Sequence, residues 1–240
     1  MAGRFVVLEG GDGVGKTTLA RMVADLDYDQ ALKALAEQAP SGLVYVPRRQ
    51  ISGTSDYSAS LMRHLSTMLW DSGDSPDLPD SFWVALQAAW FTAHATTVIG
   101  PLLDAGCDVI VDGWVYKFFS KLLQQGYDQA ALDTIFARVR MPDAVILLTA
   151  DPAVLYDRRD GQFRPAELGM HADLPDLGKD TFVAYQAAGQ RLLRETAVRR
   201  GWPTMLVDAD EQPDQTAARL TPIVAELRRH DTLTYGGSPR

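Results

Sequence analysis

The residues most able to do chemistry in this chain lie in a glycine-rich segment near its start. Residues 10–17 read G-x-x-x-x-G-K-T, between an apolar stretch at 5–9 and a helix-forming stretch at 17–26. Backbone N–H groups of such a loop can surround phosphate oxygens, Lys16 can reach the β- and γ-phosphates, and the Thr17 hydroxyl can bind Mg²⁺. A glycine-rich turn without a ligand would not explain a lysine at a helix N-terminus, where the helix dipole disfavours a cation. The segment therefore predicts an ATP site formed by Gly10, Gly11, Gly13, Val14, Gly15, Lys16, Thr17 and Thr18.

Two aspartates accompany this loop. Asp12 lies inside it and is a candidate catalytic residue: it could accept a proton, bind Mg²⁺ through water or hold an acceptor hydroxyl, or it could simply form the turn. Asp112 ends the apolar run 108–112, as in a Walker B element that holds Mg²⁺. The alternative for Asp112 is a strand-end cap. We expect Thr17 and Asp112 to be the metal ligands.

Arginines form two further groups. Arg48 and Arg49 follow the second apolar run, where paired guanidinium groups could hold a phosphate or merely lie in a solvated turn. Arg158, Arg159 and Arg164 stand at the start of a Gly- and Pro-rich stretch that suits a lid over residues 157–178. Lid arginines can neutralise charge during phosphoryl transfer, although arginine is also common at helix C-termini for electrostatic reasons. We predict a catalytic role for these three arginines.

The elements that would position these residues alternate between strands and helices. Nearly continuous apolar runs predict five buried parallel strands at 5–9, 43–46, 108–112, 144–149 and 204–208. Helical patterns separate the strands, at 17–26, 29–38, 58–70, 81–104, 116–124, 130–139, 152–159, 180–200 and 215–228. The alternation predicts an α/β fold of three layers, a P-loop α/β/α sandwich with helices on both faces of the sheet. Ligands would bind at the carboxyl ends of the strands.

Composition restricts the class of protein further. The chain has 240 residues, a formal net charge of −8, a sequence pI near 4.9 and one cysteine, Cys107. We expect one domain at 1–234, with a surface connection at 71–80 and a flexible tail at 235–240. An acidic chain is not expected to bind nucleic acid, and no apolar run or leader-like segment predicts a membrane partner or export. The expected compartment is the cytoplasm.

Taken together, these motifs resemble the thymidylate kinase family of P-loop nucleoside monophosphate kinases. The resemblance covers most of the chain, namely the strand and loop at 5–18, the arginine motif at 45–49, the long helix at 86–106, the aspartate Asp112 and the segment 182–210. It implies a five-stranded parallel core, ATP with Mg²⁺, and a homodimer. The loop lacks an arginine at Gly13 and Val14, which resembles the subgroup that takes its catalytic arginine from the lid.

The differences from the family lie where the phosphoryl acceptor would bind. The Asp-Arg-Tyr motif reads Asp112-Gly113-Trp114, so the phosphate-binding arginine is missing, and Phe91 stands where an arginine would read the base. Lys117 would restore charge without bidentate geometry. The residues expected to bind the acceptor are Arg48, Arg49, Trp90, Phe91, Trp114 and Lys117.

The predicted function is Mg-ATP-dependent phosphorylation of a nucleoside monophosphate or a nucleotide-like acceptor. The acceptor is expected to differ from that of the family, because the residues that would bind it differ. Two alternatives stay open at this point. One is a kinase of a nucleoside or another small hydroxyl compound, and the other is a nucleotide-binding regulator without catalysis.

Overall fold

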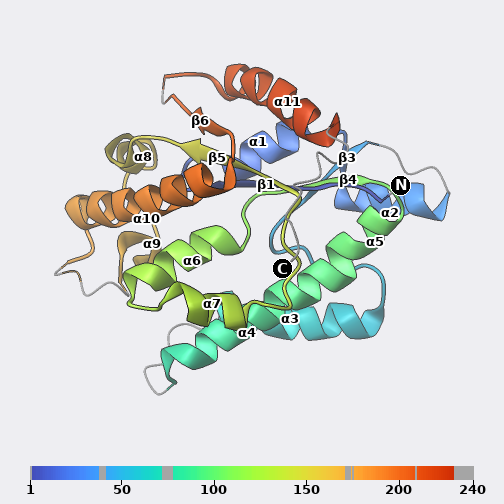
Figure 1. Cartoon of the computed structure of the whole chain (residues 1–240), viewed down its shortest axis with the longest axis horizontal. Coiled ribbons are helices and arrows are strands. Elements are labelled where there is room, and N and C mark those ends of the chain that lie inside the picture. Colours follow the sequence, from blue (N-terminus) through green and yellow to red (C-terminus); the bar gives the residue numbers. More distant parts are fainter. Residues whose placement is uncertain are drawn as a thin grey trace, which may run out of the picture.

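A twisted sheet of six parallel strands forms the centre of the molecule (Figure 1). The computed structural model describes residues 2–37, 42–71, 78–170, 174, 176–208 and 210–229. The strands lie in the order β2-β3-β4-β1-β5-β6, and each neighbouring pair is parallel. Their bounds are β1 Phe5–Gly10, β2 Leu26–Asp27, β3 Leu43–Val46, β4 Asp108–Val111, β5 Ala144–Thr149 and β6 Thr204–Leu206.

All five predicted strands are present, but the predicted count of five is wrong by one. The additional strand is β2 at the sheet edge, a two-residue segment that is too short to show an apolar pattern. The predicted helix at 17–26 also extends too far. Helix α1 covers Lys16–Val23, Ala24 is extended, and the Asp25 N–H donates to the Leu43 carbonyl at 2.8 Å. Residues 24–27 therefore join the sheet rather than the helix.

Helices cover both faces of this sheet and complete the three layers. The other helices are α2 Tyr28–Ala36, α3 Asp56–Trp70, α4 Asp80–His94, α5 Gly100–Asp104, α6 Val115–Gln124, α7 Gln129–Ile135, α8 Pro152–Arg158, α9 Pro165–Leu168, α10 Lys179–Arg200 and α11 Pro213–Arg229. Helix α7 ends four residues before its predicted end at 139. Across the described segments, no helix combines the length and the apolarity that a bilayer crossing requires.

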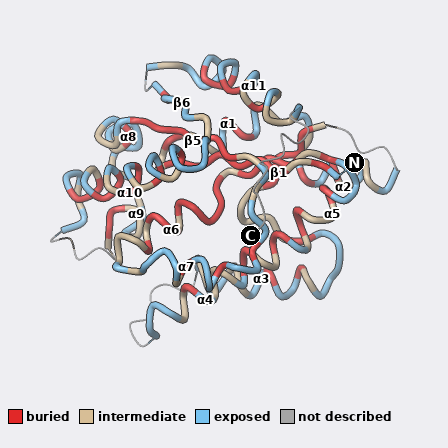
Figure 2. The backbone as a smooth tube through the Cα atoms, in the orientation of Figure 1, coloured by how far each residue is buried: buried red, intermediate tan, exposed pale blue. Residues whose placement is uncertain are grey.

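Alternating residues of β1 point into two separate hydrophobic clusters. Phe5 and Val7 join the cluster that contains α2 to α7, while Val6 and Leu8 join the cluster that contains α1, α8, α9 and α11. Helix α10 contributes to both clusters. Every residue of β1 is buried, and Figure 2 shows buried backbone running through the central sheet. This burial on both faces is why the strands are nearly continuous apolar runs in the sequence.

The predicted long helix at 81–104 contains an irregular turn. Between α4 and α5, residues Ala95–Ile99 form a π-helical segment, η1, in which the Gly100 N–H donates to the Ala95 carbonyl. Pro101 follows and has no N–H to donate to the Thr97 carbonyl one turn earlier. The Ser52 hydroxyl donates to that carbonyl instead, at 3.0 Å. The irregular turn therefore ties the long helix to the segment that follows β3.

The predicted lid at 157–178 contains the short helix α9, which packs against α10. Residues 171–173 and 175 of the lid lie outside the described residues, as do 72–77 of the predicted surface connection and the whole predicted tail at 235–240.

Candidate active site

The glycine-rich loop lies between β1 and α1, at the carboxyl end of the central strand. Gly10 has φ +149°, and a Cβ atom there would lie 2.4 Å from the Leu148 carbonyl oxygen, so only glycine fits this close approach. Lys16 Nζ donates to the carbonyls of Gly10 and Gly11, at 2.9 and 2.6 Å. These bonds hold the ammonium group over the loop, where a phosphate chain would lie.

Thr17 and Asp112 meet at the start of α1. The Thr17 hydroxyl donates to Asp112 Oδ2 at 2.5 Å, and the Arg48 backbone N–H donates to Asp112 Oδ1 at 2.9 Å. Asp112 directly follows β4, which pairs with both β1 and β3, so the sheet itself brings these three residues together. A hydroxyl and a carboxylate are hard oxygen donors of the kind that Mg²⁺ prefers, and Mg²⁺ takes one or two protein oxygens beside phosphates and water. The predicted metal ligands therefore fit Mg²⁺.

Asp12 is the centre of a buried polar network. Its carboxylate pairs with Lys117 of α6 through Oδ1, and it lies 3.6 Å from Lys121 Nζ through Oδ2. Gln186 of α10 binds Asp12 twice: its amide nitrogen donates to Oδ2 and its amide oxygen accepts from the Asp12 N–H, both at 3.1 Å. Burial alone would raise the pKa of Asp12, but the charges of Lys117, Lys121 and Lys16 hold it well below its usual value. Both carboxylate oxygens of Asp12 thus have protein partners.

The same Gln186 side chain also reaches the lid. Its amide nitrogen donates to the Glu167 carbonyl of α9 at 2.9 Å. Gln186 therefore joins three segments, namely the phosphate loop, the long helix α10 and the lid helix α9. With a relative exposure of 7%, it is buried, and loss of its contacts would leave polar groups of the loop and the lid unpaired.

Two other titratable groups beneath the loop are shifted by burial. Burial lowers the pKa of Lys117 to about 7, although the charge of Asp12 acts in the opposite direction. Burial raises the pKa of Glu9, and this outweighs the hydrogen bond of 2.9 Å that the Trp114 N–H donates to Glu9 Oε1. Perturbed groups in a cleft are typical of functional sites.

Two adjoining cavities open above these residues. The P-loop cavity, of about 290 Å³, is lined by the loop together with Thr17, Thr18 and Asp112. The aromatic cavity, of about 670 Å³, is walled by the rings of Trp70, Phe91, Trp114, Phe118 and Phe163. The residues that line both cavities are Asp12, Arg48, Lys117, Arg159 and Glu167. We call this shared boundary the junction.

Most of the predicted acceptor-binding residues line the aromatic cavity. Arg48 and Lys117 lie at the junction, and Arg49, Phe91 and Trp114 line the aromatic cavity alone. Trp90 is fully buried and lines neither cavity, but its indole N–H donates to the Arg48 carbonyl at 3.2 Å. Trp90 thus supports Arg48 from beneath rather than facing the cavity.

The three predicted lid arginines have different positions. Arg159 lies at the junction, with its guanidinium carbon 4.3 Å from the centre of the Phe163 ring. Arg164 lines only the aromatic cavity. Arg158 is exposed and lines neither cavity. The lid also touches the loop, because a Cβ atom on Gly13 would lie 3.5 Å from both Arg159 and Phe163.

Arg48 occupies the space beside Gly113, where the family motif has an arginine. Gly113 has φ +124°, and a Cβ atom there would lie 3.7 Å from Lys16 Cε and 3.9 Å from Arg48 Cδ. The aliphatic part of the Arg48 side chain therefore passes the position from which an arginine at 113 would start. The positive φ also disfavours any side chain at this position.

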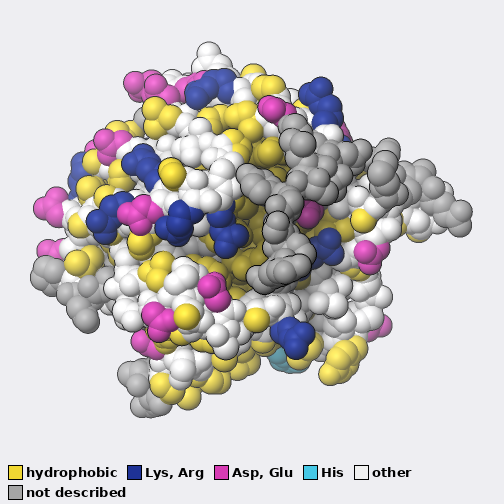
Figure 3. Space-filling view, viewed as in Figure 1, with side chains coloured by type: hydrophobic (Ala, Val, Ile, Leu, Met, Phe, Trp, Pro, Cys, Tyr) yellow, Lys and Arg dark blue, Asp and Glu magenta, His cyan; other side chains and the backbone are white. Residues whose placement is uncertain are grey.

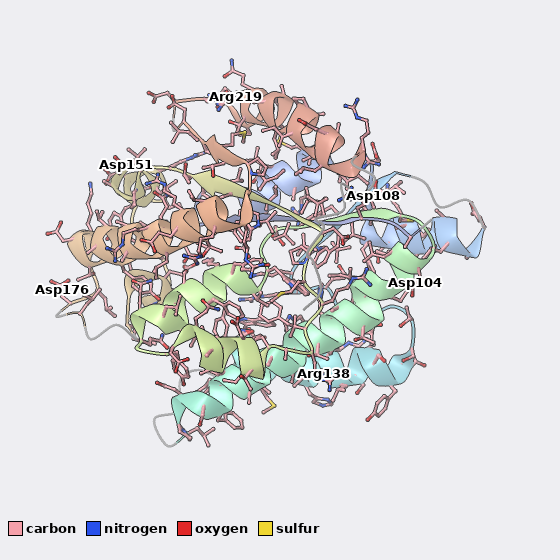
Figure 4. The ribbon with its side chains drawn as sticks, in the orientation of Figure 1. Asp104, Asp108, Arg138, Asp151, Asp176 and Arg219 are labelled. Carbon is pink, nitrogen blue, oxygen red and sulfur yellow. The ribbon has the colours of Figure 1, made fainter. Side chains whose placement is uncertain are left out.

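Sequence reasoning did not single out Gln186 or Glu167 as site residues, and it placed Glu9 at the ligand-binding edge of the sheet without giving it a role. Glu9 is visible only as a carboxylate ending an apolar strand, and Gln186 as one polar residue of an amphipathic helix. Conversely, Asp151 follows β5, as a nucleotide-site residue would, but its carboxylate accepts the Ala153 N–H at 2.8 Å and caps α8 (Figure 4).

Figure 3 shows one face of the molecular surface, where basic side chains gather over α10 among acidic ones.

Known thymidylate kinases match almost the whole chain. The protein of that name from Synechococcus sp. (strain RCC307) is 30% identical over 233 residues, covering 94% of this chain and 97% of the relative. The thymidylate kinase of Rhizorhabdus wittichii is 29% identical over 235 residues, covering 95% and 99%, and that of Bradyrhizobium diazoefficiens is 25% identical over 225 residues, covering 91% and 87%. No protein-family model matches the chain.

Proposed function

The chain belongs to the thymidylate kinase family of nucleotide kinases, and we propose that it transfers the γ-phosphoryl group of Mg-ATP to a nucleoside monophosphate or a nucleotide-like acceptor. The observation that carries this proposal is the junction between the P-loop cavity and the aromatic cavity. A kinase must hold its donor and its acceptor in adjoining spaces with cations between them, because positioning and electrostatic stabilisation supply most of the catalysis. The junction has this arrangement.

The P-loop cavity suits the ATP phosphates. Backbone N–H groups of residues 10–18 would surround them, and Lys16 would contact the β- and γ-phosphates after leaving the loop carbonyls. Thr17 and Asp112 would hold Mg²⁺, whose charge neutralises the phosphate oxygens. The Arg48 backbone N–H fixes the second oxygen of Asp112, so that its carboxylate stays oriented toward Thr17.

At the junction, Arg48 and Lys117 would orient the acceptor phosphate. An oxygen of that phosphate attacks the γ-phosphorus, the bond to the bridging oxygen of ADP breaks, and ADP leaves with the electron pair. Arg159, which the lid delivers to the junction, would neutralise charge on the transferring group. Asp12 acts through Lys117 in this scheme, since the network already uses both of its oxygens.

The position of Arg48 supports a phosphorylated acceptor rather than an unphosphorylated alcohol. Its side chain passes Gly113, so its guanidinium supplies a bidentate phosphate donor near the place where the family has one.

The aromatic cavity supports an acceptor other than thymidylate alone. Phe91 presents a ring where an arginine would bind the base edge, and it contacts Trp114 with ring centres 4.9 Å apart. Losing a charged hydrogen bond to a base costs about 1.5–3 kcal/mol where nothing replaces it. We therefore propose that the acceptor pocket has changed its selectivity within the family reaction.

A homodimer stays a prediction from the family resemblance, and a cytoplasmic location stays a prediction from the sequence pattern. The outer face of α3 supports an interface, because Tyr57 and Leu61 are 79% and 45% exposed on one side of that helix. Sedimentation analysis of the purified chain would test the dimer.

The test of the proposed function is ADP release from Mg-ATP, measured with a panel of nucleoside monophosphates, with nucleosides and without acceptor. We expect turnover that depends on a monophosphate. Turnover only with nucleosides would replace this proposal by the alcohol kinase, and ATP binding without turnover on any acceptor would favour a regulatory protein. Strong thymidylate turnover would contradict the changed selectivity but leave the kinase assignment intact.

A further inference from the structure

Two arginines of the aromatic cavity are left over once the reacting phosphate has been assigned. Arg49 and Arg164 line the aromatic cavity and not the P-loop cavity. The acceptor phosphate must lie at the junction, beside the γ-phosphate, where Arg48, Lys117 and Arg159 surround it. Arg49 and Arg164 therefore face another part of the acceptor.

Among the described residues, no acid forms an ion pair with these two arginines. Glu167, the acid of the lid helix, uses Oε2 to accept the Arg164 backbone N–H at 2.9 Å. Burial and the like charges of Arg48 and Arg164 lower the pKa of Arg49 to about 10, against the weaker attraction of Asp71 and Glu167. In the part of the chain that the structure describes, these like charges therefore lie near one another without an ion-pair partner for Arg49 or Arg164.

Aromatic rings hold one of these arginines in place. The Arg49 guanidinium carbon lies 4.2 Å from the centre of the Trp70 ring, in a cation–π arrangement. Phe91 and Trp114 form the adjacent wall of the same cavity. A stacked guanidinium keeps its N–H groups directed along its own plane, where a carboxylate or phosphate can accept two of them.

A guanidinium can only donate hydrogen bonds, so its partner on the acceptor must accept them. We propose that the acceptor carries a second anionic group, a carboxylate or a second phosphate, which Arg49 and Arg164 bind within the aromatic cavity. The aromatic walls would hold a flat ring between the two anionic ends. This inference rests on the proposed function, because it takes the reacting phosphate to lie at the junction.

The experiment compares three acceptors with Mg-ATP. Thymidylate is the reference, 5-carboxy-2′-deoxyuridine 5′-monophosphate has a carboxylate in place of the thymine methyl group, and thymidine 3′,5′-bisphosphate has its second anion on the sugar. We expect one of the two doubly anionic acceptors to exceed thymidylate in kcat/KM by about tenfold or more, as charge-assisted bidentate bonds would give. The better of the two distinguishes a base-side from a sugar-side anion.

Substitution then assigns this preference to the two arginines. Arg49→Met and Arg164→Met should each bring the ratio of kcat/KM for the doubly anionic acceptor to kcat/KM for thymidylate close to one. Arg49→Lys should give an intermediate ratio, because lysine keeps the charge but cannot form the bidentate bonds of a guanidinium. The ratio is informative because a general loss of activity or folding does not change it. Arg194→Met, an exposed change on α10, is the matched control and should leave the ratio at its wild-type value.

Calorimetric binding of the same three compounds separates this inference from the proposed function. Turnover of thymidylate with no preference for either doubly anionic acceptor, in turnover or in binding, overturns the second anion and leaves the kinase intact. Preferential binding that the arginine substitutions remove, without any turnover, supports the anion subsite and overturns the kinase. A preference that survives both methionine substitutions also overturns the subsite.

Discussion

The two adjoining cavities differ in how the chain builds them. The P-loop cavity comes mainly from one continuous stretch, residues 10–18, together with Asp112 from the neighbouring strand. The aromatic cavity is assembled from segments far apart in the chain, around residues 49, 70, 91, 114–121 and 159–167. The family resemblance predicts that the donor side keeps the family's residues, whereas the acceptor side has Phe91 and Gly113 where the family has arginines.

The two cavities therefore differ in which amino-acid substitutions they tolerate. The loop depends on glycines at positive φ and on close backbone contacts such as that of Gly10 with Leu148, so few substitutions preserve it. The acceptor wall depends on side chains that project from already stable helices. Exchanging those side chains changes what the cavity holds without changing the backbone that carries them.

Lys16→Ala should nearly abolish phosphoryl transfer from ATP. We expect kcat to fall by about a thousandfold, as for other cations that contact a transferring phosphoryl group. The unfolding temperature should change little, because Lys16 bonds only to loop carbonyls. ADP release at saturating ATP is the measurement. Unchanged turnover in the purified variant would show that this loop does not bind the reacting nucleotide.

Lys117 allows a test of the junction through pH. Its pKa is lowered to about 7, so the side chain loses its charge as the pH rises above that value. We expect kcat/KM for the acceptor to fall above pH 7, approaching about tenfold per pH unit, because this parameter reports the free enzyme. In Lys117→Arg the fall should disappear, since arginine stays charged. A falling limb that persists in the arginine variant would assign the titration to another group.

Gln186→Leu should weaken the connection between the loop and the lid. The change leaves the Asp12 N–H and the Glu167 carbonyl without their partner, which costs about 1–3 kcal/mol of stability. We also expect kcat to fall by about tenfold, because Arg159 is carried by the lid that Gln186 holds.

Gln190→Leu is the matched control for that prediction. Gln190 is one turn further along α10 and equally buried, but its amide donates to the Ala150 carbonyl rather than to a described residue of the loop or the lid. It should lose similar stability and keep its kcat. Equal losses of kcat in the two variants would mean that Gln186 is only structural.

Sequence reasoning succeeded where short-range chemistry decides the structure. The loop motif and the five long strands could be predicted because a glycine spacing and a buried apolar run are both local signals. Strand β2 could not, because two residues carry no periodicity and their pairing depends on β3. The π-helical turn before Pro101 was missed for a similar reason, since its cause includes a hydroxyl from Ser52 far away in the sequence.

The candidate site shows the same limit more sharply. Arg48, Arg159 and Lys117 were predicted and meet at the junction, yet the partners that orient them were not. Gln186 is 174 residues from Asp12, and only the packing of α10 beside the loop brings them together. Trp90 was predicted to bind the acceptor from the family resemblance, but it is next to Phe91 on a helix, where neighbouring residues point in directions about 100° apart. Its burial follows from that geometry.

The smallest expected effect comes from that buried indole. In Trp90→Phe, the Arg48 carbonyl loses its hydrogen bond, worth about 1 kcal/mol, and Arg48 becomes less firmly held. We expect KM for the acceptor to rise by about threefold to tenfold while KM for ATP stays constant. The reason is that Arg48 is proposed to bind the acceptor phosphate rather than ATP. Trp83→Phe in the same helix is the control and should change neither value. If KM for ATP rose together with KM for the acceptor, Trp90 would support the whole carboxyl edge of the sheet. The P-loop cavity and the aromatic cavity would then be less independent of each other than their separate origins in the sequence indicate.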